Sequence, residues 1–252
     1  MGEMKRSVLL LLLAFLLTPA VARGDTYAVL VGIAQYQQAD ANLRLPVSDA
    51  KAVAAIYEAR GAHVTTLYDR QATRSQILKT LSAVLSQAGK DDTVLFFFSG
   101  HGGTGYLCPY DMSARKGSEL RYTDVAAIYK ACTARTKLMF VDACHAGGFR
   151  LSARKGPDKA GMSDVLLFLS SRTGETSIES PRMTNGFFTT YLARGLRGGA
   201  DANGDRKVTA HELFTFVHDG VTDVSADKQH PVMWGNFDDD LVLMDWTDKA
   251  KK

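Results

Sequence analysis

A cysteine and a histidine each follow a strongly apolar run, and these two residue types can serve together as a nucleophile and its base. The run Thr93–Phe98 leads, after two residues, to His101, and the run Lys137–Val141 leads in the same way to Cys144. In an open α/β sheet, functional residues gather at the carboxyl ends of the strands. We therefore expect Cys144 to attack as a thiolate and His101 to accept and return its proton.

The glycines around these two residues fit the same chemistry. A glycine lets the backbone approach a substrate closely, so the N–H groups of Gly102 and Cys144 are expected to form an oxyanion hole. Taken singly, each motif also has a structural interpretation: the histidine as a turn residue and the cysteine as a small core residue. Their joint position favours catalysis. His145 is a rival base, but neighbouring side chains on an extended segment point in opposite directions, which favours His101.

Acidic and polar residues are predicted to lie beside this pair. Side chains two residues apart on a strand share a face, which places Asp142 with Cys144 and Ser99 with His101. Asp49 begins a predicted helix at the same edge of the sheet. These residues would form an acidic, substrate-binding pocket for an Arg or Lys side chain. The alternatives are that Asp49 is an ordinary helix N-terminal acid and that Asp142 binds N–H groups of a loop.

The elements that must position these residues alternate between strands and helices. Short apolar runs predict buried strands, and apolar residues at helical spacing predict the helices between them. This order is typical of one α/β domain with a mostly parallel sheet. The predicted strands are 27–33, 63–68, 93–98, 137–141, 165–169 and 241–244, and the predicted helices are 47–60, 74–87, 123–131, 187–196 and 210–221.

Length and composition set the remaining limits. The chain has 252 residues, 46% hydrophobic and 23% charged, with a net charge of +3, which indicates a globular protein. It contains no basic block, so nucleic-acid binding is not indicated. Residues 1–22 combine a basic start, a short apolar run and an Ala-Val-Ala end, and this predicts a secretory signal peptide ahead of a domain at 23–252. The mature chain is then exported, periplasmic or secreted, without a membrane contact; an uncleaved anchor is the alternative.

The strand ending in His-Gly and the strand ending in Asp-Ala-Cys-His-Ala-Gly together resemble the caspase-like cysteine peptidases, and most of all the metacaspases and bacterial caspase homologues. The resemblance runs from Tyr27 to about Met244. It implies a three-layer sandwich with a central sheet of about six strands, a Cys144–His101 dyad, and protein or peptide substrates cut after Arg or Lys. The chain departs from the family at Pro46, where some metacaspases carry a cysteine.

A segment with the spacing of a calcium-binding loop lies near the C-terminus. The spacing places the side chains of Asp201, Asn203, Asp205 and Glu212 and the carbonyl of Lys207 as ligands for Ca²⁺. However, Arg206 stands where such a loop turns sharply and prefers glycine. The alternative is an acidic turn before a helix capped by Thr209 and Glu212. No cofactor is required for the cysteine chemistry itself.

Two further features leave alternatives open. Cys108 and Cys132 could pair after export, or remain separate core thiols. The polar stretch Arg150–Ser163 follows the nucleophile and contains basic residues, so we expect self-cleavage there, unless the loop is spared. Besides an endopeptidase, the sequence admits a catalytically silent binding module or another Cys–His hydrolase. Oligomeric state is not predicted.

Overall fold

The computed structural model describes residues 24–115, 117–144, 146, 162, 164–175, 177 and 183–247. The predicted signal peptide, His145 and nearly all of the stretch 150–163 lie outside these residues. Among the described residues, no helix is both long and apolar enough to cross a membrane.

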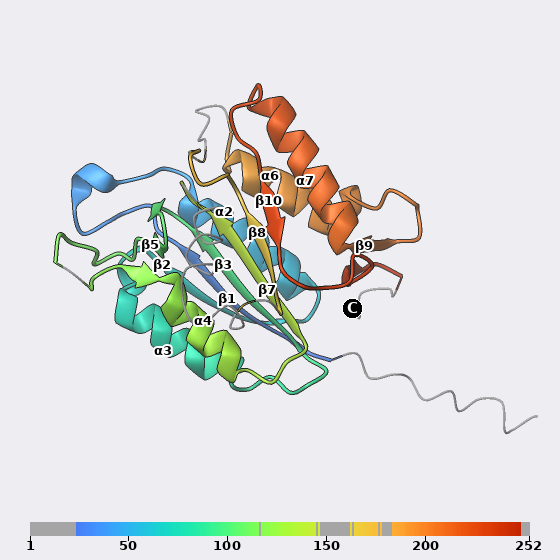
Figure 1. Cartoon of the computed structure of the whole chain (residues 1–252), viewed down its shortest axis with the longest axis horizontal. Coiled ribbons are helices and arrows are strands. Elements are labelled where there is room, and N and C mark those ends of the chain that lie inside the picture. Colours follow the sequence, from blue (N-terminus) through green and yellow to red (C-terminus); the bar gives the residue numbers. More distant parts are fainter. Residues whose placement is uncertain are drawn as a thin grey trace, which may run out of the picture.

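The central element is a six-stranded sheet (Figure 1) with the strand order β10-β8-β7-β3-β1-β2. The five strands from β8 to β2 are parallel, and β10 runs antiparallel to β8 at one edge. The mostly parallel sheet predicted from the sequence is thus confirmed. The strands are β1 (Thr26–Gly32), β2 (His63–Tyr68), β3 (Thr93–Ser99), β7 (Thr136–Asp142), β8 (Val165–Leu169) and β10 (Val232–Trp234).

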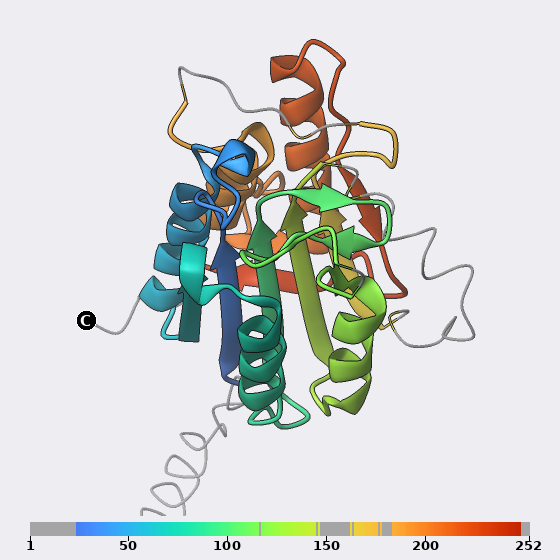
Figure 2. The ribbon, with the colours of Figure 1, turned by 90° about the vertical axis from the view of Figure 1, so that its left-hand side faces the viewer.

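Helices cover both faces of this sheet and make the three predicted layers. On one face, α2 (Pro46–Ala59), α6 (Phe187–Arg194) and α7 (Ala210–Val224) bury their apolar side chains against residues such as Phe97 and Phe140. On the other face, α3 (Arg74–Leu85) and α4 (Tyr122–Ala131) pack on residues such as Phe96 and Phe98. Figure 2 shows α3 and α4 lying in front of the strands. Because both faces are covered, the inner strands β3, β7 and β8 are buried and strongly apolar, as parallel strands usually are, whereas the edge strand β2 contains polar residues.

Short elements complete the fold, and most of them were not predicted. The antiparallel strands β4 (Gly102–Gly103), β5 (Tyr106–Leu107) and β6 (Leu120–Arg121) form a small sheet after β3. The predicted strand 241–244 is β11 (Val242–Asp245), but it pairs with β9 (Lys207–Thr209) outside the central sheet. The sixth central strand is β10 instead. The remaining turns are η1 (Ala39–Ala41), η2 (Asp69–Gln71) and the π-helical η3 (Gly195–Gly199).

The register of the sheet brings three strand ends into one row. Gly32 of β1 pairs with Ser99 of β3, and Ser99 pairs with Asp142 of β7. The N–H of Gly100 then donates to the carbonyl of Asp142 at 3.2 Å, which joins the segments that follow β3 and β7. In Figure 2 the arrowheads of β1, β3 and β7 point to the same edge. The two segments that carry the candidate dyad therefore leave the sheet side by side.

Candidate active site

Cys144 lies two residues beyond β7, on a backbone that a buried serine holds in place. The N–H of Ala143 donates to Oγ of Ser170 at 3.1 Å, and the same hydroxyl donates to the carbonyl of Ala143 at 3.1 Å. Oγ of Ser171 also donates to that carbonyl, at 3.4 Å. Ser170 and Ser171 are fully buried, whereas Cys144 is partly exposed. The segment is therefore fixed behind the cysteine, and the thiol itself is open to a substrate.

The imidazole of His101 is oriented by two contacts that the sequence did not predict. Its Nε2 lies 2.9 Å from the carbonyl oxygen of Ala41, and its ring packs on Tyr36 with the centroids 5.1 Å apart. The backbone N–H of His101 donates to the Tyr36 hydroxyl at 2.7 Å. A carbonyl only accepts, so Nε2 carries the proton, and in the neutral ring the lone pair is on Nδ1. Nδ1 is then the nitrogen that can take a proton from a nucleophile.

Gly102 lies against the nucleophile segment, and its N–H is free of the small sheet. The N–H of Cys108 donates to the carbonyl of His101, so Gly102 and Leu107 form a non-hydrogen-bonded pair. In such a pair the backbone N–H points away from the partner strand. A Cβ at Gly102 would lie 3.0 Å from both the Cβ of Ala143 and the carbonyl oxygen of Cys144. The absence of a side chain is what lets the two segments approach.

We expect Gly102→Ala to lower kcat by about 10- to 100-fold, because the added methyl group displaces the Cys144 segment while the N–H donor remains. Gly89→Ala is the matched control, since a Cβ there would contact only Oδ2 of Asp92, at 3.6 Å. Peptide hydrolysis by both variants, measured beside thermal unfolding, tests this. A Gly102→Ala variant with wild-type kcat would show that the close approach of Gly102 to the Cys144 segment is not needed for catalysis.

Asp49 is buried near the start of α2, and three donors bind its carboxylate. Oδ2 accepts the hydroxyl of Ser99 at 2.9 Å, and Oδ1 accepts the side-chain amide of Asn185 at 2.9 Å and the N–H of Gly186 at 3.0 Å. The side chain is only 2% exposed. A carboxylate has about four lone-pair sites. The described contacts therefore leave room for a further donor at Asp49.

Asp142 is the second buried carboxylate, and its partners lie around the start of α6. Oδ2 accepts the N–H of Thr189 at 3.2 Å and its hydroxyl at 2.7 Å, and Oδ1 accepts the hydroxyl of Ser177. Gly186 lies between the two acids: a Cβ there would be 2.9 Å from Oδ2 of Asp142 and 3.6 Å from Oδ2 of Asp49. The structure thus brings Asp49, Ser99 and Asp142 together, as predicted.

The two carboxylates disfavour each other's charge. Burial, and next the neighbouring Asp142, raises the pKa of Asp49 to about 7. Asp49 accepts the N–H of Gly186 at the start of α6, a different helix from its own, and Asp142 accepts the N–H of Thr189 in α6. A cation bound beside Asp49 would favour the ionised form of this acid.

The three cysteines are free thiols, so the alternative of a Cys108–Cys132 disulfide is wrong. Sγ of Cys132 is buried and donates to the carbonyl of Leu85 at 3.3 Å. Burial, and next the charge of Cys144, raises the pKa of Cys108 to about 12. Cys108 therefore stays protonated at neutral pH and is a poor nucleophile.

The predicted calcium loop is folded around its own backbone. Asp201 accepts the N–H groups of Gly204 and Arg206, Asn203 accepts that of Asp205, and Asp205 accepts that of Lys207. Arg206 takes the left-handed conformation that the spacing required, with φ 65°. The side chains of Asp201, Asn203 and Asp205 therefore accept backbone N–H groups of their own turn.

Glu212 caps the helix α7 together with Thr209, which was the alternative to the calcium loop. Its Oε2 accepts the N–H and the hydroxyl of Thr209 at 3.0 and 2.9 Å, and the Thr209 hydroxyl accepts the N–H of Glu212. Within the described part of the chain, no group of three or more His, Cys, Asp or Glu side chains is arranged to hold a metal ion. These residues therefore form the capping box before α7, and the calcium site stays a prediction.

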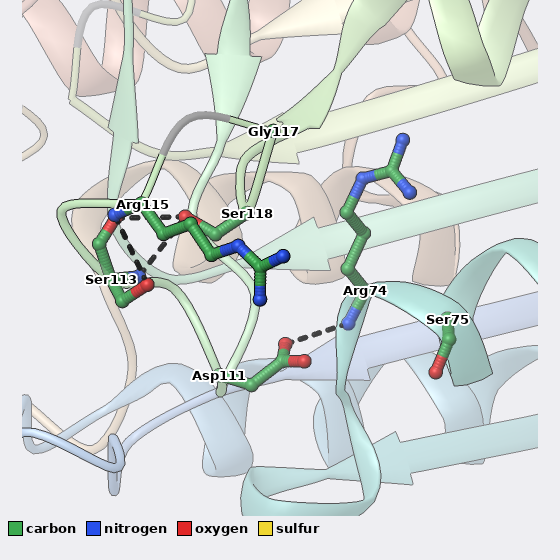
Figure 3. A pocket seen from close by; sticks show the side chains of 7 residues that line it. All are labelled: Arg74, Ser75, Asp111, Ser113, Arg115, Gly117 and Ser118. Carbon is green, nitrogen blue, oxygen red and sulfur yellow. Dashed lines mark hydrogen bonds between the residues drawn. The ribbon is translucent and has the colours of Figure 1, made fainter.

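A separate hollow of about 400 Å³ lies at the start of α3 (Figure 3) and is lined by Arg74, Ser75, Asp111, Ser113, Arg115, Gly117 and Ser118. Asp111 already accepts the N–H of Arg74 at 2.8 Å, and the guanidinium of Arg74 pairs with Asp124 at 2.8 Å. The hollow shares no residue with the strand-end site. The hollow is thus separate from the strand ends that carry His101 and Cys144.

Comparisons with known proteins show the family and the fold of the chain. The pattern of the caspase domain matches residues 25–242. A protein from Geobacter sulfurreducens has a similar structure, with a TM-score of 0.62 and 20% identity over 85% of this chain and 95% of that one. Caspase-1 from Spodoptera frugiperda is also similar, with a TM-score of 0.66 and 18% identity over 90% and 92% of the two chains. No curated protein matches the sequence.

Proposed function

The chain belongs to the caspase-domain family of cysteine peptidases, and from that premise we propose that it is an endopeptidase that uses Cys144 and His101 and cleaves after Arg or Lys. In this proposal Cys144 attacks the peptide carbonyl, the N–H groups of Gly102 and Cys144 bind the oxyanion, and His101 returns the proton to the leaving amine. The substrates are peptides or proteins.

The observation that carries the specificity is the pair of buried carboxylates beside the nucleophile. Asp142 precedes Cys144 by two residues, and Asp49 faces the same point at Gly186. A guanidinium or ammonium group beside them would favour the ionised form of Asp49, whose pKa is raised by burial and next by Asp142. An aspartate side chain there would add a third negative charge, which disfavours the caspase type of specificity.

The direct test is covalent labelling. A peptidyl acyloxymethyl ketone ending in Arg is expected to label Cys144, and the same peptide ending in Asp is expected to leave it unlabelled. Mass spectrometry of the tryptic peptides identifies the labelled thiol. Labelling by the Asp reagent alone would contradict the proposed specificity, and labelling by neither would favour the silent binding module.

The second candidate is such a module, a caspase-like domain that recruits a partner without turnover. The oriented imidazole of His101 and the open thiol of Cys144 favour catalysis over this role, since a binding module needs neither. Turnover of a positional-scanning peptide library distinguishes the two functions and also another Cys–His hydrolase.

We also propose that the protein is exported and that its signal peptide is removed after residue 22. The basic start and the Ala-Val-Ala end of this segment support the proposal. The N-terminal sequence of the protein purified from its native compartment tests it. A mature chain that begins at Arg23 is the expected result, and a chain retained in the membrane fraction with Met1 intact would contradict it.

Self-cleavage is expected between Arg150 and Lys159, because a peptidase that cuts after basic residues meets such residues directly after its own nucleophile. The two pieces should stay associated, since β8 remains a strand of the shared sheet. Intact-mass spectrometry of stored wild type beside Cys144→Ala measures this. The same cut in the inactive variant, or none in the wild type, would show that the stretch is not a self-cleavage site.

A further inference from the structure

The imidazole of His230 is held between two carboxylates, away from the dyad. Its Nδ1 lies 2.8 Å from Oε1 of Glu175, and its Nε2 lies 2.9 Å from Oδ1 of Asp227. An ionised carboxylate only accepts, so both ring nitrogens donate and the ring is an imidazolium. The hydrogen bonds to Asp227 and then to Glu175 raise the pKa of His230 above its ordinary value. Only 13% of the side chain is exposed.

Glu175 connects this ring to the segment that follows β8. Its Oε2 accepts the N–H of His230 at 2.9 Å and the N–H of Arg172 at 3.1 Å. The guanidinium of Arg172 lies 3.9 Å from Oε1 of the same carboxylate. The charged groups that face the ring among the described residues are therefore Glu175 and Asp227, with Arg172 behind Glu175. Glu175 thus ties the turn Ser170–Glu175 to the segment around His230.

The same turn holds the backbone next to the nucleophile. Ser170 and Ser171 bind the carbonyl of Ala143, and Oγ of Ser171 also donates to the carbonyl of Glu175 at 3.3 Å. Ala143 directly precedes Cys144. A movement of the turn would therefore move the nucleophile segment.

A second connection runs through the residue before His230. The side chain of Gln229 is fully buried, and its amide donates to the carbonyl of Ser170 at 2.9 Å and to Oγ of Ser177 at 3.4 Å. Ser177 in turn donates to Asp142. The two connections begin at the adjacent residues Gln229 and His230 and end at the adjacent residues Asp142 and Ala143.

We propose that His230, with Glu175 and Asp227, is a positioning residue that holds the Asp142–Cys144 segment in place while its ring is charged. Its predicted effect on kcat/KM rests on the proposed peptidase function, whereas its predicted effect on the mobility of the Asp142–Cys144 segment does not. Because the pKa of His230 is raised, the contact is complete below the ordinary histidine pKa of about 6.5 and is lost as the pH rises through the higher value in the folded protein. Deprotonation leaves one ring nitrogen facing a carboxylate without a proton to donate.

The kinetic test is the pH profile of kcat/KM for a peptide ending in Arg, measured with the full mature chain. Wild type is expected to lose activity on the alkaline side, and Glu175→Gln is expected to move this loss to lower pH because one of the two acids that favour the charged ring is gone. His230→Gln is expected to lower kcat about tenfold at neutral pH and to lack this alkaline step. His218→Gln is the matched control, since His218 pairs with Asp219 at 3.0 Å on the surface of α7.

Hydrogen exchange separates this proposal from the proposed function, since it needs no turnover. In Cys144→Ala, the amide of Ala143 should exchange at least about tenfold faster once His230→Gln or Glu175→Gln is added, and His218→Gln should have no effect. Both His230→Gln and Glu175→Gln are measured, so that the test still stands if one of the two variants fails to fold. Unchanged exchange and an unchanged pH profile in both would overturn the role of His230. Accelerated exchange in these variants, combined with no peptide cleavage by the protein that keeps Cys144, would retain the role of His230 and reject the peptidase.

Discussion

Replacing Cys144 with alanine is expected to lower kcat/KM for peptide cleavage by about 10⁴-fold or more, and His101→Ala by a similar factor, without unfolding the protein. The two residues act as one unit, so the double variant should be no worse than either single one. Stopped assays on an Arg-ending peptide, read beside the unfolding temperature of each variant, measure both effects.

The physical reason lies in the two segments that leave β3 and β7 together. His101 has its Nε2 bound by the carbonyl of Ala41, which leaves Nδ1 as the base. Ala143 is fixed by Ser170, which places the backbone of Cys144 before substrate binds. The contacts of Ala143 do not involve the Cys144 side chain, so Cys144→Ala should cost catalysis and not stability. His101→Ala does remove the hydrogen bond to Ala41 and the packing on Tyr36, but one such hydrogen bond contributes only about 1 kcal/mol, so the variant should still fold.

Matched controls come from the chain's other cysteines and histidines. Cys108→Ala is expected to keep near wild-type activity, because the raised pKa of Cys108 keeps its thiol protonated. His63→Ala removes an exposed imidazole on β2 and should also have no effect. A Cys144→Ala enzyme that still turned over near the wild-type rate would exclude the dyad. Loss of activity in a folded Cys108→Ala enzyme would also contradict it, because it would point to Cys108 as the nucleophile.

The sequence predicted the parts of this site whose signal lies in residue type and strand position. The apolar runs before His101 and Cys144 became β3 and β7, neighbours in the sheet. Alternation predicted that Ser99 lies with His101 and Asp142 with Cys144, and the register adds that Ser99 and Asp142 are paired across β3 and β7. The long buried strands were the clearest signal, because a strand covered on both faces is apolar at every position.

The supporting contacts could not be predicted, because they involve backbone groups or very short elements. Every residue has a backbone carbonyl, so no sequence pattern identifies that of Ala41 as the group that orients His101. Strand β10 has only three residues and none of them is fully buried, so its apolar run is too short to identify a strand. The serines that hold Ala143 stand directly after β8, where hydroxyl residues are also common in ordinary turns.

The other large effect is expected from Asp49→Asn, which should lower kcat/KM for Arg-ending peptides by roughly 10²- to 10³-fold and yet stabilise the free enzyme at pH 8. The loss follows because a buried substrate cation would face one carboxylate fewer. Asparagine fits the site: its carbonyl can accept from Asn185 and Gly186, and its amide can donate to Ser99, whose hydroxyl can rotate to accept.

The gain in stability follows from the direction of the pKa shift. The pKa of Asp49 is raised to about 7, by burial first and by Asp142 second, so the folded state favours the protonated acid. This contribution to stability is complete below the ordinary aspartate pKa of about 3.9 and is lost as the pH rises through about 7. Asparagine resembles the protonated acid at every pH. Its advantage over Asp49 should therefore be a few kcal/mol at pH 8 and close to zero at about pH 4.

These two results together distinguish a substrate pocket from a structural contact. If Asp49 served only to bind the start of α6, its charge would favour those N–H groups, and Asp49→Asn would destabilise the protein without changing specificity. If it awaits a cationic side chain, the charge is costly until substrate binds, so stability and activity move in opposite directions. Urea unfolding at pH 4 and pH 8 and kinetics on Arg- and Asp-ending peptides decide between the two roles, with the exposed Asp40→Asn as control. A variant that is less stable at pH 8 and still prefers Arg would overturn the pocket.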